Sequence, residues 1–482
     1  MSEQGEPRRP ASARPSARTV ALASARVALA VVALGVAIVT VGAAAMLPLP
    51  TIAPTPGSTL VVPVATPQSL VCPGAVLRLG DASGQDVSTA SPIGQASVAA
   101  GGDPDRSALD GPGGAIGLTG AGETDSTVSG AQLQELSDPA ASGLAATACA
   151  PVASESWLIG GSNAVGRTTV LTLDNPSDVA ATVDLSIWDE SGAVTARGAT
   201  GISVGAHAQS VIALAGLAPD AVSPVVRVES TGGLITATLQ ETVVRGLETA
   251  GADLVGASAA PSGSLVFPGL TVRGSDDVES RIFADTTGAS DDLAPVLRLF
   301  APGGAATDAT IEVRPLDGSP GTTSTVSVPA GQVLDAPIEG LVDGEYTIAV
   351  SSAEPLVGAV RMSTAVGTDR TSGTSDLAWS VAPPRLGSAA VAEVVDGAPA
   401  RLHLVNPGGS PIDATVTDPT GAAKDVPLEP GATWSTDAAA GSWGVSATGA
   451  VAASVTYAAD GELATYPVLP RVADADPVRV YP

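Results

Sequence analysis

The chain has few side chains that could carry acid–base chemistry, and its two histidines are the first to consider. These are His207 and His403. A catalytic histidine needs a nucleophile or carboxylate within hydrogen-bond reach, and neither histidine lies in a motif that supplies one. The sequence also lacks a G-x-S-x-G elbow, an H-E-x-x-H pair, a phosphate-loop lysine motif and a dinucleotide glycine fingerprint. We therefore expect a protein that is not an enzyme, with no catalytic residue and no cofactor.

A threefold internal repeat explains where both histidines lie. His403 aligns with Thr172 and Arg298, between two leucines that should point inward, so we expect it on the solvent face of a strand. His207 aligns with Gly331 and Gly431 in a predicted turn. A positive φ is expected there, and histidine tolerates it better than most residues.

Three acidic clusters could ligate Ca²⁺, which prefers carboxylate oxygens. They are Asp276-Asp277, Asp291-Asp292 and Asp474-Ala475-Asp476. None has the spacing of an EF-hand loop, and the alternative is solvated loop charge. We therefore predict no metal site.

The two cysteines, Cys72 and Cys149, are most simply joined as one disulfide. A reactive thiol or a metal pair is the alternative, but no clustered histidine or further cysteine supports it.

Aromatic residues make up only 2% of the chain, so exposed tryptophans would be informative. Trp188 directly follows Ile187 and should therefore lie on the opposite strand face, while Trp434 flanks a turn. Either indole could stack on a sugar ring or a partner. The alternative for both is packing in a core or between modules.

The repeat itself indicates an all-β fold of tandem immunoglobulin-like or fibronectin-like sandwiches. Leu171–Pro176 matches Leu297–Pro302 and Leu402–Pro407, and each copy alternates apolar and polar residues. Turn signals such as Asn175-Pro176 and Asp317-Gly318 fall at intervals typical of sandwiches. The predicted modules are 157–262, 263–382 and 384–470.

The N-terminal part predicts a membrane anchor. Arginines dominate the charges of residues 1–26, and Val27–Leu47 carries no charged side chain. A helix of that length spans about 30 Å, the thickness of a bilayer core. The arginines place residues 1–26 in the cytoplasm and the C-terminal part outside. Cleavage of a signal peptide near Ala45 is the alternative.

Two further segments lie between the anchor and the modules. Residues 48–71 are proline-rich and predict an extended stalk. Residues 72–149 are rich in Gly, Ser, Ala and Asp and contain no Phe, Trp or Tyr. This composition predicts a flexible loop closed by the disulfide. Short ordered stretches are expected at Ala75–Leu79 and Gln132–Leu136.

The net charge of −27 argues against a nucleic-acid partner, because such a surface repels phosphate backbones.

The pattern resembles a family of uncharacterised exported proteins of high-GC Gram-positive bacteria, classed as a domain of unknown function. The matching residues are the N-terminal anchor, Val71–Gly74, Cys149, Trp157–Ser162 and Leu171–Pro176 with its later copies. The resemblance covers most of residues 60–470. It implies an envelope-associated, β-rich ectodomain and supplies no catalytic residues.

The expected function is that of a single-pass envelope protein whose modules act as spacer and interaction scaffold. Its partner would be an envelope protein or a wall polysaccharide. A glycan-binding protein of the cell wall is the main alternative, and a hydrolase with an unrecognised site is a weaker one.

Overall fold

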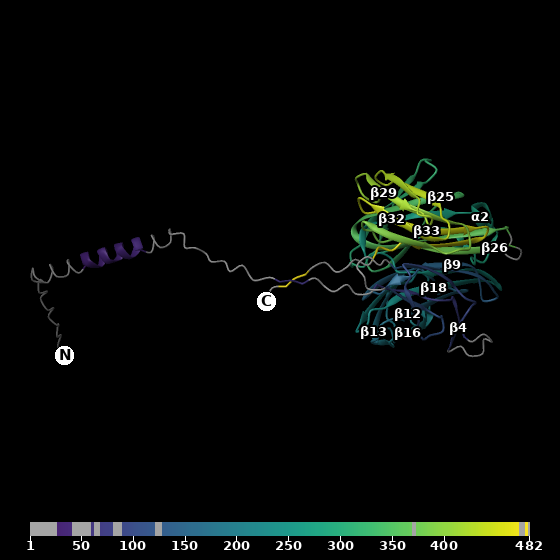
Figure 1. Cartoon of the computed structure of the whole chain (residues 1–482), viewed down its shortest axis with the longest axis horizontal. Coiled ribbons are helices and arrows are strands. Elements are labelled where there is room, and N and C mark those ends of the chain that lie inside the picture. The colour runs from purple at the N-terminus through teal and green to yellow at the C-terminus, as the bar shows by residue number, and fades with distance from the viewer. Residues whose placement is uncertain are drawn as a thin grey trace, which may run out of the picture. The chain divides into compact units, whose positions relative to one another are not determined.

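The computed structural model divides the chain into two units (Figure 1). It describes residues 27–40, 59–61, 68–80, 89–120, 128–368, 373–471 and 478–480. The first unit comprises Met1–Val62 and Pro477–Pro482. In it, a helix covers residues 27–40, and β1 (Thr59–Val61) pairs antiparallel with β35 (Val478–Val480).

Among the described residues, no helix has both the length and the apolarity needed to cross a membrane. The predicted span Val27–Leu47 continues into residues 41–47, which lie outside the described residues. The same is true of most of the predicted stalk and of the Asp474-Ala475-Asp476 cluster.

The second unit, Pro63–Asp476, is nearly all β, as the alternating pattern predicts. Its described helical elements are short, and the longest is α2 (Ser275–Ala284). The other two are the 3-10 turns η1 (Leu214–Gly216) and η2 (Asp291–Leu293).

Module 1 consists of two antiparallel sheets that enclose one hydrophobic cluster. The first sheet has the order β11-β17-β13-β14, with β15 also on β13, and the second has the order β16-β12-β18-β19. The strands are β11 (Glu155–Ile159), β12 (Arg167–Asn175), β13 (Ala181–Asp189), β14 (Gly192–Val194), β15 (Ile202–Val204), β16 (Ala208–Ala213), β17 (Val225–Thr231), β18 (Thr236–Arg245) and β19 (Glu248–Val255).

Module 3 repeats this order, except that the single strand β30 takes the place of β14 and β15. Its sheets are β27-β32-β29-β30 and β31-β28-β33-β34. The strands are β27 (Ala389–Val394), β28 (Ala400–Val405), β29 (Ile412–Thr417), β30 (Ala423–Leu428), β31 (Thr433–Asp437), β32 (Gly441–Ala447), β33 (Ala452–Ala459) and β34 (Glu462–Pro467).

Module 2 has the same plan, except that one strand serves both sheets. The first part of β25 pairs with β20 and β22, and its last part pairs with β21 and β26. The strands are β20 (Ser262–Val272), β21 (Val296–Phe300), β22 (Thr307–Pro315), β23 (Thr322–Val328), β24 (Val333–Pro337), β25 (Gly344–Val366) and β26 (Thr374–Val381).

The repeated leucine motif lies at the same place in each module. It falls in β12, β21 and β28, a central strand of the second sheet each time. Its paired leucines are fully buried in all three copies. Burial of that aliphatic surface, worth about 25 cal/mol per Å², is the main attraction that holds each pair of sheets together.

The structure corrects the expectation of a flexible loop between Cys72 and Cys149. The described residues form an N-terminal module (68–151) with sheets β10-β2-β7-β6, β5-β8-β9 and β3-β4. Its strands are β2 (Ser69–Cys72), β3 (Leu77–Leu79), β4 (Ala90–Pro92), β5 (Ser97–Gly101), β6 (Asp105–Ala108), β7 (Ile116–Thr119), β8 (Ser129–Asp138), β9 (Ala141–Ala148) and β10 (Ala150–Pro151).

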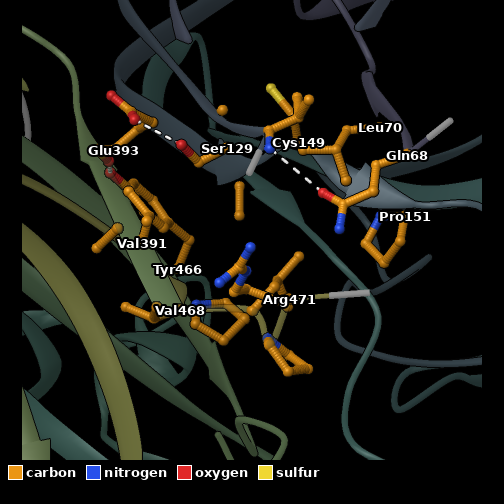
Figure 2. Close-up of a pocket in the computed structure, with 17 residues that line it drawn as sticks. Gln68, Leu70, Ser129, Cys149, Pro151, Val391, Glu393, Tyr466, Val468 and Arg471 are labelled. Atoms are coloured by element: carbon orange, nitrogen blue, oxygen red, sulfur yellow. Dashed lines mark hydrogen bonds between the residues drawn. The ribbon is translucent and has the colours of Figure 1, made fainter. Parts of the chain in front are cut away.

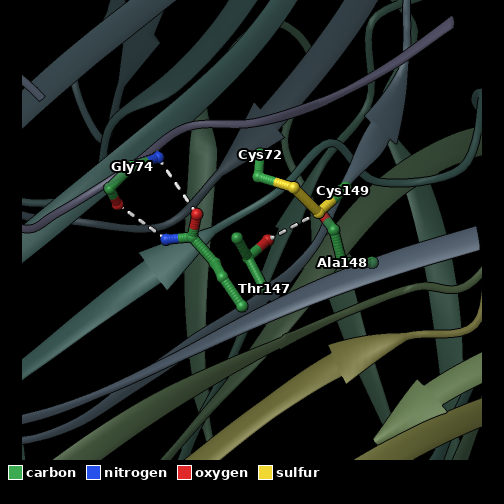
Figure 3. The surroundings of a disulfide bond; sticks show 6 residues. Cys72, Gly74, Thr147, Ala148 and Cys149 are labelled. Carbon is green, nitrogen blue, oxygen red and sulfur yellow. Dashed lines mark hydrogen bonds between the residues drawn. A yellow bond between two sulfur atoms is a disulfide. The ribbon is translucent and has the colours of Figure 1, made fainter. Parts of the chain in front are cut away.

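Alanine and leucine supply the core that aromatic residues would otherwise provide. Leu70, Leu118 and Val128 surround the disulfide, whose predicted pairing Cys72–Cys149 is confirmed (Figure 3). A second cluster joins Leu136 and Ala145 of this module to Leu254 of module 1. The segment is therefore ordered partly by surface that its neighbour contributes.

The four modules are joined at the centre by one strand from each. β19 contacts β9 and β26, and β34 contacts β26 and β9, so the four strands close a ring. Asp376 of β26 lies at its centre and is completely buried. Its carboxylate accepts backbone N–H bonds from Leu144 (2.8 Å), Ala252 (3.3 Å) and Leu463 (3.0 Å), one from each of the other three modules.

Two glycines make room for this carboxylate. Gly143 and Gly251 lie beside Asp376, have positive φ, and would each crowd it if they carried a Cβ. Nearby, Asp253 of β19 accepts a bond from the Trp379 backbone N–H of β26 at 2.7 Å. Burial raises the pKa of Asp253 and Asp376 well above the usual range, against the lowering effect of these bonds.

Contacts between side chains and backbone fix each boundary between modules. Gln209 donates to the Pro73 carbonyl, and Ser454 donates to the Pro268 carbonyl. The boundary between module 3 and the N-terminal module is fixed by Glu393, which accepts from Ser129 at 2.7 Å (Figure 2). A cavity of about 30 Å³ beside it is lined by Gln68 and Arg471, so both ends of the described second unit meet there.

We predict that Asp376→Ala destabilises the whole second unit. The substitution leaves backbone N–H groups of several modules buried without an acceptor, which should lower the free energy of unfolding by about 3 kcal/mol or more. Urea denaturation followed by tryptophan fluorescence measures this. The control is Asp308→Ala, at an exposed strand position. Equal stability of the two variants would contradict the role of Asp376.

We also predict that Asp174 makes the stability of the fold depend on pH. This side chain is completely buried. One of its carboxylate oxygens accepts a hydrogen bond from Gln209, and the other has no partner among the described residues. Burial raises its pKa to about 7. Between pH ~4 and ~7 the unfolded chain loses a proton that the folded chain keeps, so this contribution to stability falls as pH rises.

The variant Asp174→Asn cannot titrate and should be close to wild type at pH 5. At pH 8 it should be more stable than wild type, by up to about 3 kcal/mol. Urea denaturation of both proteins at the two pH values tests this. An unchanged difference between pH 5 and pH 8 would show that Asp174 does not titrate in this range.

Candidate functional site

A cleft of about 640 Å³ between modules 1 and 2 gathers charged side chains. Three arginines line it: Arg167 from β12, Arg298 from β21 and Arg361 from β25. Asp292 of η2 and Asp335 of β24 line it too. In a chain of net charge −27, this is a notable local concentration of guanidinium groups.

All the N–H donors of Arg298 are engaged in hydrogen bonds, some of which join the two modules. It makes a two-pronged ion pair with Asp335, through Nε at 2.8 Å and Nη2 at 2.9 Å. Its Nη1 donates to the carbonyls of Gly161 and Pro224 in module 1. Only 1% of Arg298 is exposed, so this side chain is a structural tie with no donor left for a ligand.

Asp292 is shared by two other arginines. Arg245 donates to its Oδ1 at 2.8 Å, and Arg167 donates to its Oδ2 at 2.9 Å. Burial acts to raise the pKa of Asp292, but the two cations outweigh it and the pKa is lowered. The pKa of Asp335 is lowered in the same way, with Arg298 outweighing burial. Both carboxylates are therefore ionised at neutral pH.

Arg361 differs from its neighbours because it has no ion pair. Among the described residues, its Nη2 donates a long hydrogen bond of 3.3 Å to the Ala294 carbonyl, and its Nε is buried without a partner. Its guanidinium lies 5.7 Å from the centre of the Trp379 ring, which also contacts Arg298 at 4.5 Å. The buried donor that lacks a partner in the cleft is therefore cationic, whereas Asp291, which also lines the cleft, is exposed.

Trp379 forms the buried link between this cleft and module 1. Its Nε1 donates to Glu241 of β18 at 2.6 Å. Burial raises the pKa of Glu241, and the bond from Trp379 opposes that rise. The indole is only 2% exposed.

The structure separates the two histidines into modules 1 and 3. His207 has the predicted positive φ, 49°, and pairs with Asp178 through Nε2 at 2.7 Å on the surface. His403 corrects the expectation of a solvent-facing residue, because it is completely buried. The outer face of its sheet packs on β20 of module 2, where a Cβ at Gly269 would collide with the imidazole.

Both predicted ligand-facing tryptophans are partly buried. Trp188 stacks on Trp157 with ring centres 5.7 Å apart and lies 4.9 Å from Phe300 of module 2. It therefore takes part in packing between modules. Trp434 packs against the core of module 3, and the Lys424 ammonium lies 5.3 Å from its ring centre.

One member of each described acidic pair serves local structure. Asp277 accepts from the Gly367 backbone N–H at 2.8 Å, and Asp292 binds the two arginines described above. Among the described ranges of the chain, no group of three or more His, Cys, Asp or Glu side chains could hold a metal ion.

Comparison with known families identifies the chain. The sequence pattern of a family of unknown function, DUF5719, matches residues 98–439. The chain belongs to the DUF5719 family. No curated protein matches this DUF5719 chain.

A solved structure, the tetra-tandem repeat in the extending region of a large adhesion protein, is 14% identical. The match covers 85% of this DUF5719 chain and 92% of that chain, with a TM-score of 0.11. A score this low supports no argument about shared architecture or function.

Sequence reasoning did not find the cleft. Arg298 stands between two inward leucines, which indicates a solvated position, and Arg361 lies in an apolar run of β25 without any motif. The only available signal was that an arginine occupies the repeat position held by histidine in module 3 and threonine in module 1.

We predict that His403→Leu does not destabilise the protein at pH 7. Both ring nitrogens are buried without a partner, so leucine removes a desolvation cost and should add about 1 kcal/mol of stability. Burial lowers the pKa of His403 to about 3. Between pH ~6.5 and ~3 the unfolded chain binds a proton that the folded chain does not, so the stability of the wild type falls as pH drops through this range.

Urea denaturation at pH 7 and pH 4.5 checks both statements. The leucine variant should lose less stability than wild type on acidification. A loss of more than about 2 kcal/mol at pH 7 would mean that the imidazole makes a bond essential to the boundary.

Proposed function

We propose that this DUF5719 chain is a non-enzymatic envelope protein that presents a rigid interaction platform outside the membrane. Its modules would be immunoglobulin-like sandwiches, as the repeat predicts, and its partner an envelope protein or a wall polymer. The observation that carries the proposal is the bonding of Asp376 to strands of three other modules.

This bonding favours a platform over an extended spacer. In a string of spacers, neighbouring modules share small polar contacts and move independently. Here β9, β19, β26 and β34 contact one another, and a buried arginine ties module 2 to module 1. A surface made of several modules would keep a fixed shape, which suits the binding of a partner with little ordering cost.

The histidines and buried aspartates that could take part in acid–base chemistry are engaged in structural contacts, which supports a role without catalysis. Among the described residues, His403 is sealed between modules, and His207 pairs with a surface carboxylate. Asp292 and Asp335 are neutralised by arginines. These groups are occupied in holding the fold and are not aligned around a reacting centre.

Two sequence features support a location outside the cell. The apolar segment Val27–Leu47 follows an arginine-rich stretch, consistent with a retained anchor or with a signal peptide cleaved near Ala45. The Cys72–Cys149 disulfide suits an oxidising compartment.

Affinity capture tests the proposal. Tagged full-length protein, solubilised in mild detergent, is incubated with envelope extract and, separately, with purified wall fragments, and bound components are identified by mass spectrometry. We expect specific retention from one of the two by the native protein and none by a heat-unfolded sample.

Trp434→Ala separates the two partner classes. Its ring is partly exposed and could stack on a sugar, so loss of wall-fragment retention in this variant would favour the glycan-binding alternative. We expect retention to be unchanged. Retention no greater than that of the unfolded sample in both arms would contradict a binding role.

A further inference from the structure

We infer that the cleft between modules 1 and 2 binds an oxyanion, a carboxylate or a phosphate, through Arg361. The anion would be attached to an apolar group. The inference rests on the proposed function, since it names the chemistry that a partner or ligand must carry to use this face.

The first argument is the imbalance of hydrogen-bond donors in the cleft. Of its three lining arginines, Arg167 and Arg298 are each paired with an aspartate. Arg361 has no such partner among the described residues, and its Nε is buried without an acceptor. A guanidinium group left in this state favours an incoming anion, because an unmet charged donor in a partly desolvated site is costly.

The second argument is that the acids acting on Arg361 are already bonded elsewhere. Asp291 also lines the cleft, but it is exposed and is not among the acids that shift the pKa of Arg361. Asp335 accepts from Arg298 through both oxygens and from Ser223. Asp292 likewise accepts through both oxygens, and Glu241 accepts from Trp379. These acids attract Arg361 electrostatically, while Arg298 repels it. They offer it no direct bond.

The third argument concerns the shape and the walls of the cleft. The guanidinium plane matches the two oxygens of a carboxylate or phosphate and can bind them side by side. Val165, Val222 and Val296 line the same space. Val165 is 95% exposed and Val222 is 48% exposed, so apolar surface faces solvent at the cleft. A volume of about 640 Å³ holds a small organic group.

The negative net charge makes non-specific binding of anions to this protein unfavourable. A surface of net charge −27 repels anions at long range, so weak, scattered anion binding is suppressed. Saturable binding of an anion to this protein would therefore report a local cationic site.

Calorimetric titration of the full-length protein with two probes, inorganic phosphate and benzoate, tests the inference at constant ionic strength. We expect saturable binding of at least one probe with a dissociation constant of ~1 mM. Tighter binding of benzoate indicates a carboxylate with an apolar body, and tighter binding of phosphate indicates a phosphate ester.

Three variants locate the site. Arg361→Gln should weaken binding at least about tenfold, since it removes a charge-assisted, two-pronged contact. Val222→Asp places a negative charge in the cleft without altering Arg361 and should weaken binding similarly. Val342→Asp, a matched control at a 65% exposed valine that does not line the cleft, should bind as wild type does.

The inference is overturned if the folded wild type binds neither probe below ~50 mM, or if both cleft variants bind as tightly as wild type. Should Arg361→Gln fail to fold, the comparison of Val222→Asp with Val342→Asp decides the question. Because the probes are small anions, the result is independent of envelope capture. If the protein captures an envelope component but binds neither anion, only the anion site is contradicted. If it binds an anion but captures nothing, only the proposed interaction platform is contradicted.

Discussion

The carboxylate of Asp376 accepts backbone N–H bonds from β9, β19 and β34, and each of these strands belongs to a different module. Strand edges at the centre of a protein need partners, since an unpaired buried N–H costs about as much as a lost hydrogen bond. One side chain meets several of these needs at once. The small residues Gly143 and Gly251 allow it to approach, so the position of every module depends on this group.

The same solution, a buried polar tie, recurs at the boundaries. Arg298 joins module 2 to carbonyls of module 1, Gln209 joins module 1 to Pro73, and Glu393 joins module 3 to Ser129. Buried polar and ionic groups add little net stability after desolvation, but they penalise any arrangement that leaves them unpaired. Their contribution here is to select one packing of the four β modules over others that bury equal apolar area.

The repeat predicts the strands of modules 1 to 3, but neither the N-terminal module nor the way the modules pack. The alternation around Leu171, Leu297 and Leu402 correctly predicts strands whose leucines are buried, and the turn at His207 is confirmed by its positive φ. Alternation says nothing about whether the second face is covered by a neighbour. The pattern therefore predicts a solvent-facing His403, which is in fact buried, and it gives no indication of a site at Arg361.

Closure of β9, β19, β26 and β34 into a ring has a consequence for how the family can vary. An open array of repeats can gain or lose a copy, because each repeat touches only its two neighbours. A closed ring has no free end at which a copy could be added, and a deletion would leave the surviving modules unable to meet at the original angle. Removal of any one module from this chain would therefore expose buried strand surface on both of its neighbours in the ring.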